Sequence, residues 1–176
     1  MKKIRIDKDK NIIPSEEVDT FVRNGNSVFF KAFQVYKDGV IDCFGESNIE
    51  GFVNKIRKGT ICLKPEKGDK VRFGRVGNTE CDVVVDKVKV YTNDTEDKMI
   101  LTVLYIIDKL NGIDRCKVCI ECFNTWVEDK NEGNLQQLEE NYLKLPHHYR
   151  HITIGHMMKI SECARYITFF SEYFVI

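Results

Sequence analysis

The sequence predicts a single α+β domain over residues 1–176, built on a mostly antiparallel, twisted sheet with one long buried helix and two shorter helices. Three observations lead to this class. Several short runs rich in β-branched and aromatic residues end at turn signals, which is typical of antiparallel strands. The segment at about 95–111 has apolar residues at helical spacing. A hydrophobic share of 43 % is enough for a packed core.

The clearest element is a predicted hairpin over residues 27–44, SVFFKAFQVYKDGVIDCF. Its first half carries bulky side chains at both parities, so we expect a central strand that is covered on both faces. The turn Asp38-Gly39 suits a two-residue loop because both residues tolerate a positive φ. Such a loop places Tyr36 opposite Ile41.

The residues before this hairpin give weaker signals. Residues 2–7 fit an edge strand that lysines protect from further pairing. A strand at 21–23 can pair back onto the hairpin across the turn 24–25, and a helical turn is the favoured interpretation of 15–18. The segment 7–11 imitates the start of a calcium loop but lacks its glycine and its bidentate glutamate, so we do not expect calcium.

A short helix and three strands are predicted between the hairpin and residue 92. Asn48 suits an N-cap, the apolar residues after it share one helix face, and Gly59 suits the residue that ends the helix. The strands are expected at 60–63, 70–75 and 81–92. In the last of them valines alternate with lysines, which indicates one buried face. Asp86 interrupts that face and would need a charged partner if it were buried.

The long helix has the strongest end signals in the chain. Asp94 opens it, acidic residues fill its first turn, and Gly112 follows its last turn. We expect the helix to lie across the sheet, buried on more than one side. Its predicted inner stripe is Ile100, Val103, Leu104, Ile107 and Leu110.

The C-terminal part predicts a strand at 116–127 and an acidic amphipathic helix at 134–145 that ends before Pro146. Two further strands are expected at 152–154 and 165–170, and the apolar end EYFVI is expected to be docked on the fold.

Three cysteines could hold a metal. Cys116, Cys119 and Cys122 are spaced like the first three cysteines of the motif that binds an iron–sulfur cluster in bacterial ferredoxins. Trp126 stands where the fourth cysteine of that motif belongs. A structural zinc site would need a second pair of ligands. On a strand, Cys119 would point away from the other two. Buried thiols are therefore the favoured interpretation, and we expect no metal and no cofactor.

Four histidines, at positions 147, 148, 151 and 156, lie within ten residues. With a cysteine such as Cys163 they suggest an alternative function, a small metal- or thiol-dependent enzyme. Exposed imidazoles on a loop are the favoured interpretation, and the lack of any recognised catalytic motif favours a protein without catalytic activity. The candidate metal ligands of the alternative are Cys116, Cys119, Cys122, His147 and His151.

Composition narrows the range of partners. The chain has 27 basic and 27 acidic side chains, so neither nucleic acid nor an anionic membrane is an expected partner. Seven widely spread cysteines behind an N-terminus without an apolar leader indicate the cytoplasm. The longest apolar run, 99–107, is too short for a membrane span.

The acidic segment between residues 128 and 140 suggests the leading function. Only Lys130 is basic in this segment, which could therefore face a basic partner and steer its association. We expect a non-catalytic cytoplasmic protein that binds or regulates another protein, for example by neutralising a toxin as an immunity protein does. The candidate contact residues are Glu128, Asp129, Glu132, Glu139 and Glu140.

The stretch FFKAFQVYKDGVIDCF, the short helix after it and the turn PEKGDKVRF together resemble a pattern in small uncharacterised bacterial proteins. There, an aromatic-rich strand, an Asp-Gly turn and an Ile-Asp-Cys-aromatic strand precede a short helix and a Pro-x-Gly turn. The resemblance covers roughly residues 20–75. Because the matching residues are turn and core types, it implies a shared fold element and no particular activity.

Overall fold

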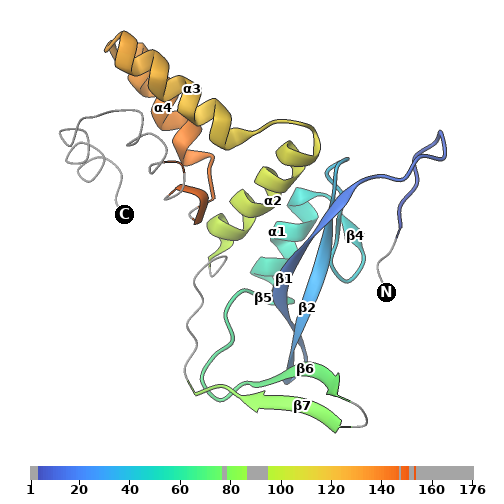
Figure 1. Cartoon of the computed structure of the whole chain (residues 1–176). Coiled ribbons are helices and arrows are strands. Elements are labelled where there is room, and N and C mark those ends of the chain that lie inside the picture. Colours follow the sequence, from blue (N-terminus) through green and yellow to red (C-terminus); the bar gives the residue numbers. More distant parts are fainter. Residues whose placement is uncertain (1–3, 77–78, 87–94, 147, 151–152, 154–176) are drawn as a thin grey trace. The chain divides into compact units, whose positions relative to one another are not determined.

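The structure, a computed structural model, describes residues 4–76, 79–86, 95–146, 148–150 and 153. The chain forms two compact units, 1–113 and 114–176. The first unit contains β1 (Ser15–Asn24), β2 (Ser27–Tyr36), β3 (Ile41–Asp42), β4 (Glu46–Ser47), α1 (Ile49–Arg57), β5 (Ile61–Cys62), β6 (Lys70–Val76), β7 (Thr79–Val84) and α2 (Glu96–Leu110). The second contains α3 (Arg115–Glu128) and α4 (Glu132–Leu143) (Figure 1). The α+β class is confirmed.

The strands of the first unit form one seven-stranded sheet with the order β4-β3-β2-β1-β5. β1 pairs with one edge of β2. On the other edge, β6 pairs with the first residues of β2 and β3 pairs with later residues of β2. β7 pairs with β6. All these pairs are antiparallel except β2–β6. The predicted, mostly antiparallel sheet is therefore confirmed.

One face of the sheet is covered by α1 and α2, which lie on the same side of β1 and β2 (Figure 1). Because strand side chains alternate between faces, every second residue of β1 faces these helices. The core between the sheet and the helices comprises Val18, Val22, Phe33, Val35, Ile41, Cys43, Phe52, Ile61, Met99, Val103 and Ile106. The opposite face carries Glu17, Asp19 and Phe21 from β1.

The helix α2 begins and ends close to the prediction, with Thr95 as its N-cap and Gly112 just past its end at φ +83°. Its buried side chains, however, are Met99, Thr102, Val103 and Ile106, and the predicted inner residue Leu104 is exposed. Apolar residues surround much of this helix, so the sequence alone did not determine which of them face the sheet.

Two predictions near the first hairpin are wrong. Residues 15–18 begin β1 instead of forming a helical turn, because the β1–β2 ladder runs unbroken from Ser15 opposite Tyr36 to Asn24 opposite Ser27. This ladder confirms the predicted pairing of 21–23 with the following strand. The turn after β2 is one residue longer than expected, so Ile41 lies opposite Val35 instead of Tyr36.

Only Gly39 in that turn needs a positive φ, at +82°. The amide of Gly39 donates to the Tyr36 carbonyl at 2.9 Å, and the amide of Tyr36 donates to the Val40 carbonyl at 2.9 Å. This is the three-residue hairpin loop in which a left-handed residue follows a type I turn. The Asp-Gly signal thus predicted the right place and the wrong loop length.

Residues 2–7 do not form the predicted edge strand within the described part, where only Ile6 makes an isolated bridge, to Ile12. The loop between them is an Asx-type turn in which Asp7 Oδ1 accepts hydrogen bonds from the amides of Asp9 (2.9 Å) and Asn11 (2.8 Å).

The elements after the hairpin mostly match the prediction. Asn48 caps α1 by accepting a hydrogen bond from the Gly51 amide at 2.9 Å. The strands predicted at 60–63, 70–75 and 81–92 correspond to β5, β6 and β7. β7 ends at Val84, and residues 87–92 lie outside the described residues. Asp86 is not on a buried strand face, because its side chain is 79 % exposed beside Lys67.

In the second unit, the strand predicted at 116–127 is wrong, since these residues form α3. Val118, Ile120 and Thr125 have high β-propensity, but the buried side chains recur at helical spacing as Cys119, Phe123 and Trp126. α4 confirms the helix predicted at 134–145. Of the strands predicted at 152–154 and 165–170, Thr153 is helical and the other residues lie outside the described part, as does the end EYFVI.

Each helix in the described ranges is too short or too polar to cross a membrane.

Candidate functional site

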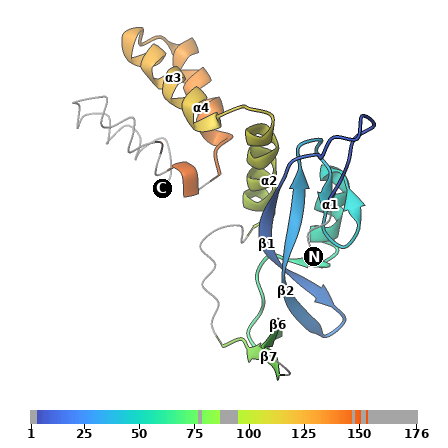
Figure 2. The same ribbon diagram turned by 45° about the vertical axis from the view of Figure 1, so that its right-hand side comes forward.

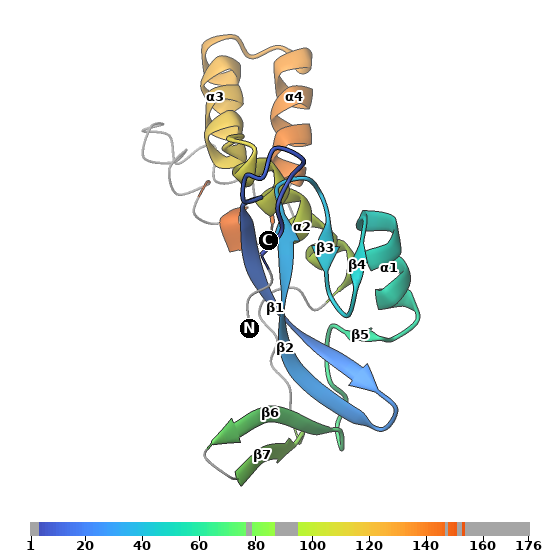
Figure 3. The ribbon, with the colours of Figure 1, turned by 90° about the vertical axis from the view of Figure 1, so that its right-hand side faces the viewer.

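The turn between α3 and α4 gathers three of the five acidic residues that the sequence singled out. Glu128 ends α3, Asp129 follows it and Glu132 begins α4, at the turn that joins these two helices in Figure 3. All three side chains are exposed. The turn is held by its own hydrogen bonds. Asn131 Nδ2 donates to Asp129 Oδ2 at 2.7 Å, and Asn134 Nδ2 donates to the Asp129 carbonyl at 2.8 Å.

The other two acidic residues lie further along α4. Glu139 is seven residues after Glu132, which corresponds to roughly 10 Å along the helix axis. At 100° per residue, Glu132, Gln136, Glu139 and Glu140 fall within one strip of the helix surface about 100° wide. Gln136 Nε2 donates to Glu140 Oε1 at 3.2 Å. Glu140 is exposed and Glu139 is half-buried. We call these five residues the acidic hairpin face, with Glu139 at its margin.

Packing between α3 and α4 supports this surface. The buried residues are Cys119, Phe123 and Trp126 on α3 and Leu138 and Tyr142 on α4. The Arg150 guanidinium lies 5.3 Å from the centre of the Tyr142 ring and donates to the Leu145 carbonyl at 3.0 Å. Since the apolar residues face inward, the polar side of α4 is left for solvent or a partner.

The helix also changes the geometry expected for the cysteines. Cys116, Cys119 and Cys122 recur every three residues, so on α3 they follow one side of the helix instead of alternating between two faces. Cys119 is buried, and desolvation, with smaller effects of Cys122 and Cys116, raises its pKa to about 12. Because the thiolate is the form that attacks substrates, a protonated Cys119 is a poor nucleophile.

Most of the remaining candidates for an enzymatic site lie outside the part of the chain that the structure describes. His147, His151, His156 and Cys163 lie outside the described residues, so the metal- or thiol-dependent alternative stays a prediction. His148 is exposed and its ring lies 4.3 Å from that of Tyr149. In the part of the chain that the structure describes, no group of three or more His, Cys, Asp or Glu side chains has a geometry that could hold a metal ion.

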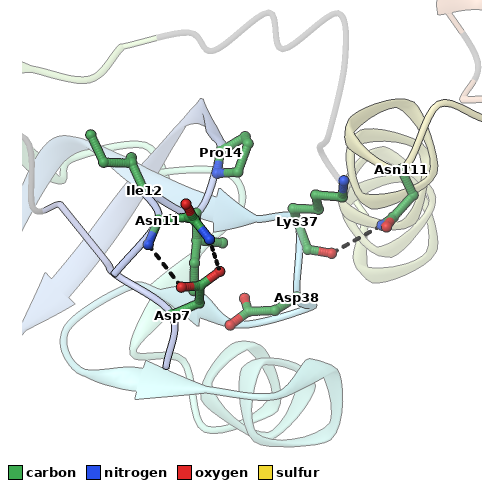
Figure 4. A pocket seen from close by; sticks show the side chains of 8 residues that line it. Asp7, Asn11, Ile12, Pro14, Lys37, Asp38 and Asn111 are labelled. Atoms are coloured by element: carbon green, nitrogen blue, oxygen red, sulfur yellow. Dashed lines mark hydrogen bonds between the residues drawn. The ribbon is translucent and has the colours of Figure 1, made fainter. Parts of the chain in front are cut away.

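One pocket that the sequence did not predict lies in the first unit. It has a volume of about 460 Å³ and is lined by Asp7, Asn11, Ile12, Ile13, Pro14, Lys37, Asp38 and Asn111. Figure 4 shows Asp7 and Asn11 turned toward each other, with Asn11 Nδ2 donating to Asp7 Oδ2 at 3.2 Å. Asn111 Nδ2 donates to the Lys37 carbonyl at 3.0 Å, which links the end of α2 to the hairpin turn.

Asp7, Asn11 and Asn111, three polar residues that line this pocket, make hydrogen bonds that hold the nearby turns in place. Hydrogen bonding from the Asn11 amide, the largest effect, lowers the pKa of Asp7, so this carboxylate is ionised and is not suited to act as a general acid at neutral pH. The spacing Asp7-Lys8-Asp9-Lys10-Asn11 was the only sequence signal for the turn. This spacing only imitates the start of a calcium loop, and the structure shows a hydrogen-bonded turn at these residues.

Comparison with known proteins matches part of the chain to a protein family. A family model described as a domain of unknown function (DUF7638) covers residues 2–113. The match ends where the first compact unit ends, at residue 113. No curated protein and no solved structure matches the chain. The acidic hairpin face and the three cysteines of α3 thus lie outside the matched region, in the second unit.

Proposed function

We infer the function from the surface of the chain itself, because the chain belongs to the DUF7638 family, which is described as a domain of unknown function. We propose a non-catalytic protein of the bacterial cytoplasm that binds a basic partner protein through the acidic hairpin face and thereby regulates or neutralises it. A basic toxin is one such partner. The observation that carries the proposal is the gathering of Glu128, Asp129 and Glu132 on one exposed turn.

The physical argument has two parts. Exposed carboxylates close together attract a positively charged surface and raise its association rate, most strongly at low ionic strength. The turn that carries them is already held by the hydrogen bonds from Asn131 and Asn134. A contact surface that is ordered before binding loses less conformational entropy when the partner arrives.

The test is a charge reversal that leaves the turn itself intact. Glu128→Lys combined with Glu140→Lys avoids Asp129, whose side chain and carbonyl both accept hydrogen bonds within the turn. The matched control is Glu66→Lys combined with Asp86→Lys, which reverses two exposed carboxylates in the first unit. Both proteins must unfold at the same urea concentration as the wild type before binding is compared.

Tagged wild-type, reversed and control proteins are used to capture partners from a bacterial lysate, and association rates are then measured with the purified partner. We expect a partner that the wild type and the control retain and the reversed variant loses. The reversed variant should associate at least about tenfold more slowly at low salt. Equal association rates for the reversed variant and the wild type at low salt would remove the acidic hairpin face from the proposal.

A further inference from the structure

Three phenylalanines form a row across the sheet face that points away from α1 and α2. Phe21 of β1 lies opposite Phe30 of β2, and their rings are 5.5 Å apart at an edge-to-face angle of 61°. Phe73 of β6 continues the row, with its ring 5.6 Å from that of Phe30. β6 reaches this place because it pairs with the beginning of β2, as Figures 1 and 2 show.

The outer end of the row is open to solvent. Phe30 is 36 % exposed and Phe73 is 50 % exposed. Phe73 is the extra residue of a β-bulge, because the β6–β7 register shifts between Arg72 and Gly74. Gly74 supplies the positive φ, +121°, that the irregular backbone needs here. Val71 lies beside Val28 in the parallel β2–β6 pair, and Phe73 and Phe30 are each two residues further along, so strand alternation places Phe73 beside Phe30 on the same face.

Carboxylates adjoin the row on the same face. Asp19 and Glu17 are two and four residues before Phe21 on β1, so their side chains point to the same side at steps of about 7 Å. Both are exposed, and Glu17 Oε1 accepts a hydrogen bond from Gln34 Nε2 at 2.6 Å. Two arginines on this face of the described sheet already have carboxylate partners: Arg23 pairs with Asp69, and Arg5 lies 3.3 Å from Asp38.

The phenylalanine row and the adjoining carboxylates indicate the chemistry of a partner that could bind this face. We propose that this face binds a segment of another protein that places an apolar side chain on Phe30 and Phe73 and an arginine or lysine at Asp19 and Glu17. A guanidinium there can bond a carboxylate and lie over an aromatic ring, and the two interactions reinforce each other. Because the negative charge adjoins the aromatic row, a segment with acidic residues at the same spacing is rejected.

This inference goes beyond the acidic hairpin face, since it concerns the other unit and the region that the family model covers. Aromatic cross-strand pairs also stabilise sheets without binding anything. That purely structural role predicts a loss of stability when a phenylalanine is removed, and no dependence of peptide binding on Asp19.

The experiment uses the full chain and two synthetic peptides of equal length, one alternating leucine with arginine and the other alternating leucine with glutamate. Binding is measured by fluorescence polarisation at physiological salt. We expect the arginine peptide to bind at least about tenfold more tightly than the glutamate peptide. Phe73→Ala and Asp19→Lys should each weaken it about tenfold or more. Phe73→Leu, which keeps an apolar surface, should weaken it less than Phe73→Ala.

The hairpin variant with Glu128→Lys and Glu140→Lys separates the two proposals, because it should bind the arginine peptide as the wild type does. Equal affinity for both peptides, or unchanged affinity of Phe73→Ala and Asp19→Lys, would overturn the inference whether or not the hairpin proposal holds. Self-association of the wild type that Phe73→Ala abolishes would overturn it too, since a second copy would then be the occupant.

Discussion

Arg23 on β1 holds Asp69 with two parallel hydrogen bonds, from Nη1 to Oδ1 at 3.1 Å and from Nη2 to Oδ2 at 2.7 Å. Asp69 Oδ2 also accepts a hydrogen bond from the Glu66 amide at 2.8 Å. The pair therefore joins the middle of the sheet to the turn from which β6 starts. Because β6 carries Phe73, this ion pair helps to set the position of the phenylalanine row.

The first prediction concerns Asp69→Asn. The hydrogen bond with Arg23 is the main cause that lowers the pKa of Asp69 below its ordinary value of 3.8. A lowered folded-state pKa contributes stability that is present above 3.8 and is lost as the pH falls through the lowered value. We expect Asp69→Asn to reduce the free energy of unfolding by about 1–2 kcal/mol at neutral pH. In urea titrations, the difference from the wild type should shrink at pH values below 3.8.

Asp86→Asn is the matched control for Asp69→Asn. Asp86 also has a basic neighbour, Lys67 at 3.5 Å, but both side chains are exposed and water screens the interaction. We expect its urea midpoint at neutral pH to equal that of the wild type. A loss of stability of the same size in both variants would show that the two parallel hydrogen bonds make the Arg23–Asp69 pair no more stabilising than the exposed Lys67–Asp86 pair.

The second prediction concerns Phe44, which has φ +53° and a side chain that is 61 % exposed. Lys55 Nζ donates to the carbonyls on either side of it, Cys43 at 2.8 Å and Gly45 at 2.6 Å, and so holds the loop in this conformation. Left-handed backbone is unfavourable for a residue with a Cβ, and glycine removes that cost. We expect Phe44→Gly to raise the free energy of unfolding by about 0.5–1 kcal/mol.

Phe44→Ala separates backbone strain from the exposed ring, because alanine removes the ring and keeps the Cβ. It should leave the urea midpoint at or below that of the wild type. If Phe44→Ala stabilises the protein as much as Phe44→Gly does, the exposed ring and not the left-handed backbone is the source of the effect.

Much of the first unit could be predicted because its signals are local. Asn48, Gly59 and Gly112 mark helix ends through contacts within one or two turns, and the structure has helix boundaries close to all three. Predictions failed where distant residues decide. Residues 15–18 have a helix-start composition, yet pairing with the end of β2 makes them a strand. α3 has strand-like residues, yet packing against α4 and helical spacing of its buried side chains make it a helix.

The two candidate binding surfaces also differ in whether residues that are close in the sequence determine them. The acidic hairpin face could be found from composition, because its residues are close in sequence and only their gathering at a turn was unknown. The phenylalanine row could not be found in that way. It depends on the parallel pairing of β2 with β6, next to which β6 has a bulge at Phe73. Neither feature has a local signature strong enough to read from one sequence.

The last prediction concerns the thiols. Burial raises the pKa of Cys43 to about 11, and that of Cys119 to about 12. Since the thiolate is the reactive form, both should be almost unreactive in the folded protein at neutral pH. Cys116 and Cys122 are half-buried, so they should be alkylated before Cys119. The measurement is timed labelling with a maleimide, followed by mass mapping of each cysteine in native and urea-unfolded protein.

The same sample decides between buried thiols and a metal site. If the thiols are simply part of the core, Cys119 becomes reactive only on unfolding, a chelator does not change its rate, and elemental analysis of untagged protein finds no stoichiometric zinc or iron. A metal site would protect Cys116, Cys119 and Cys122 together, and a chelator would release all three at once. That outcome would favour the metal-dependent alternative and would require His147 and His151 to be tested as further ligands.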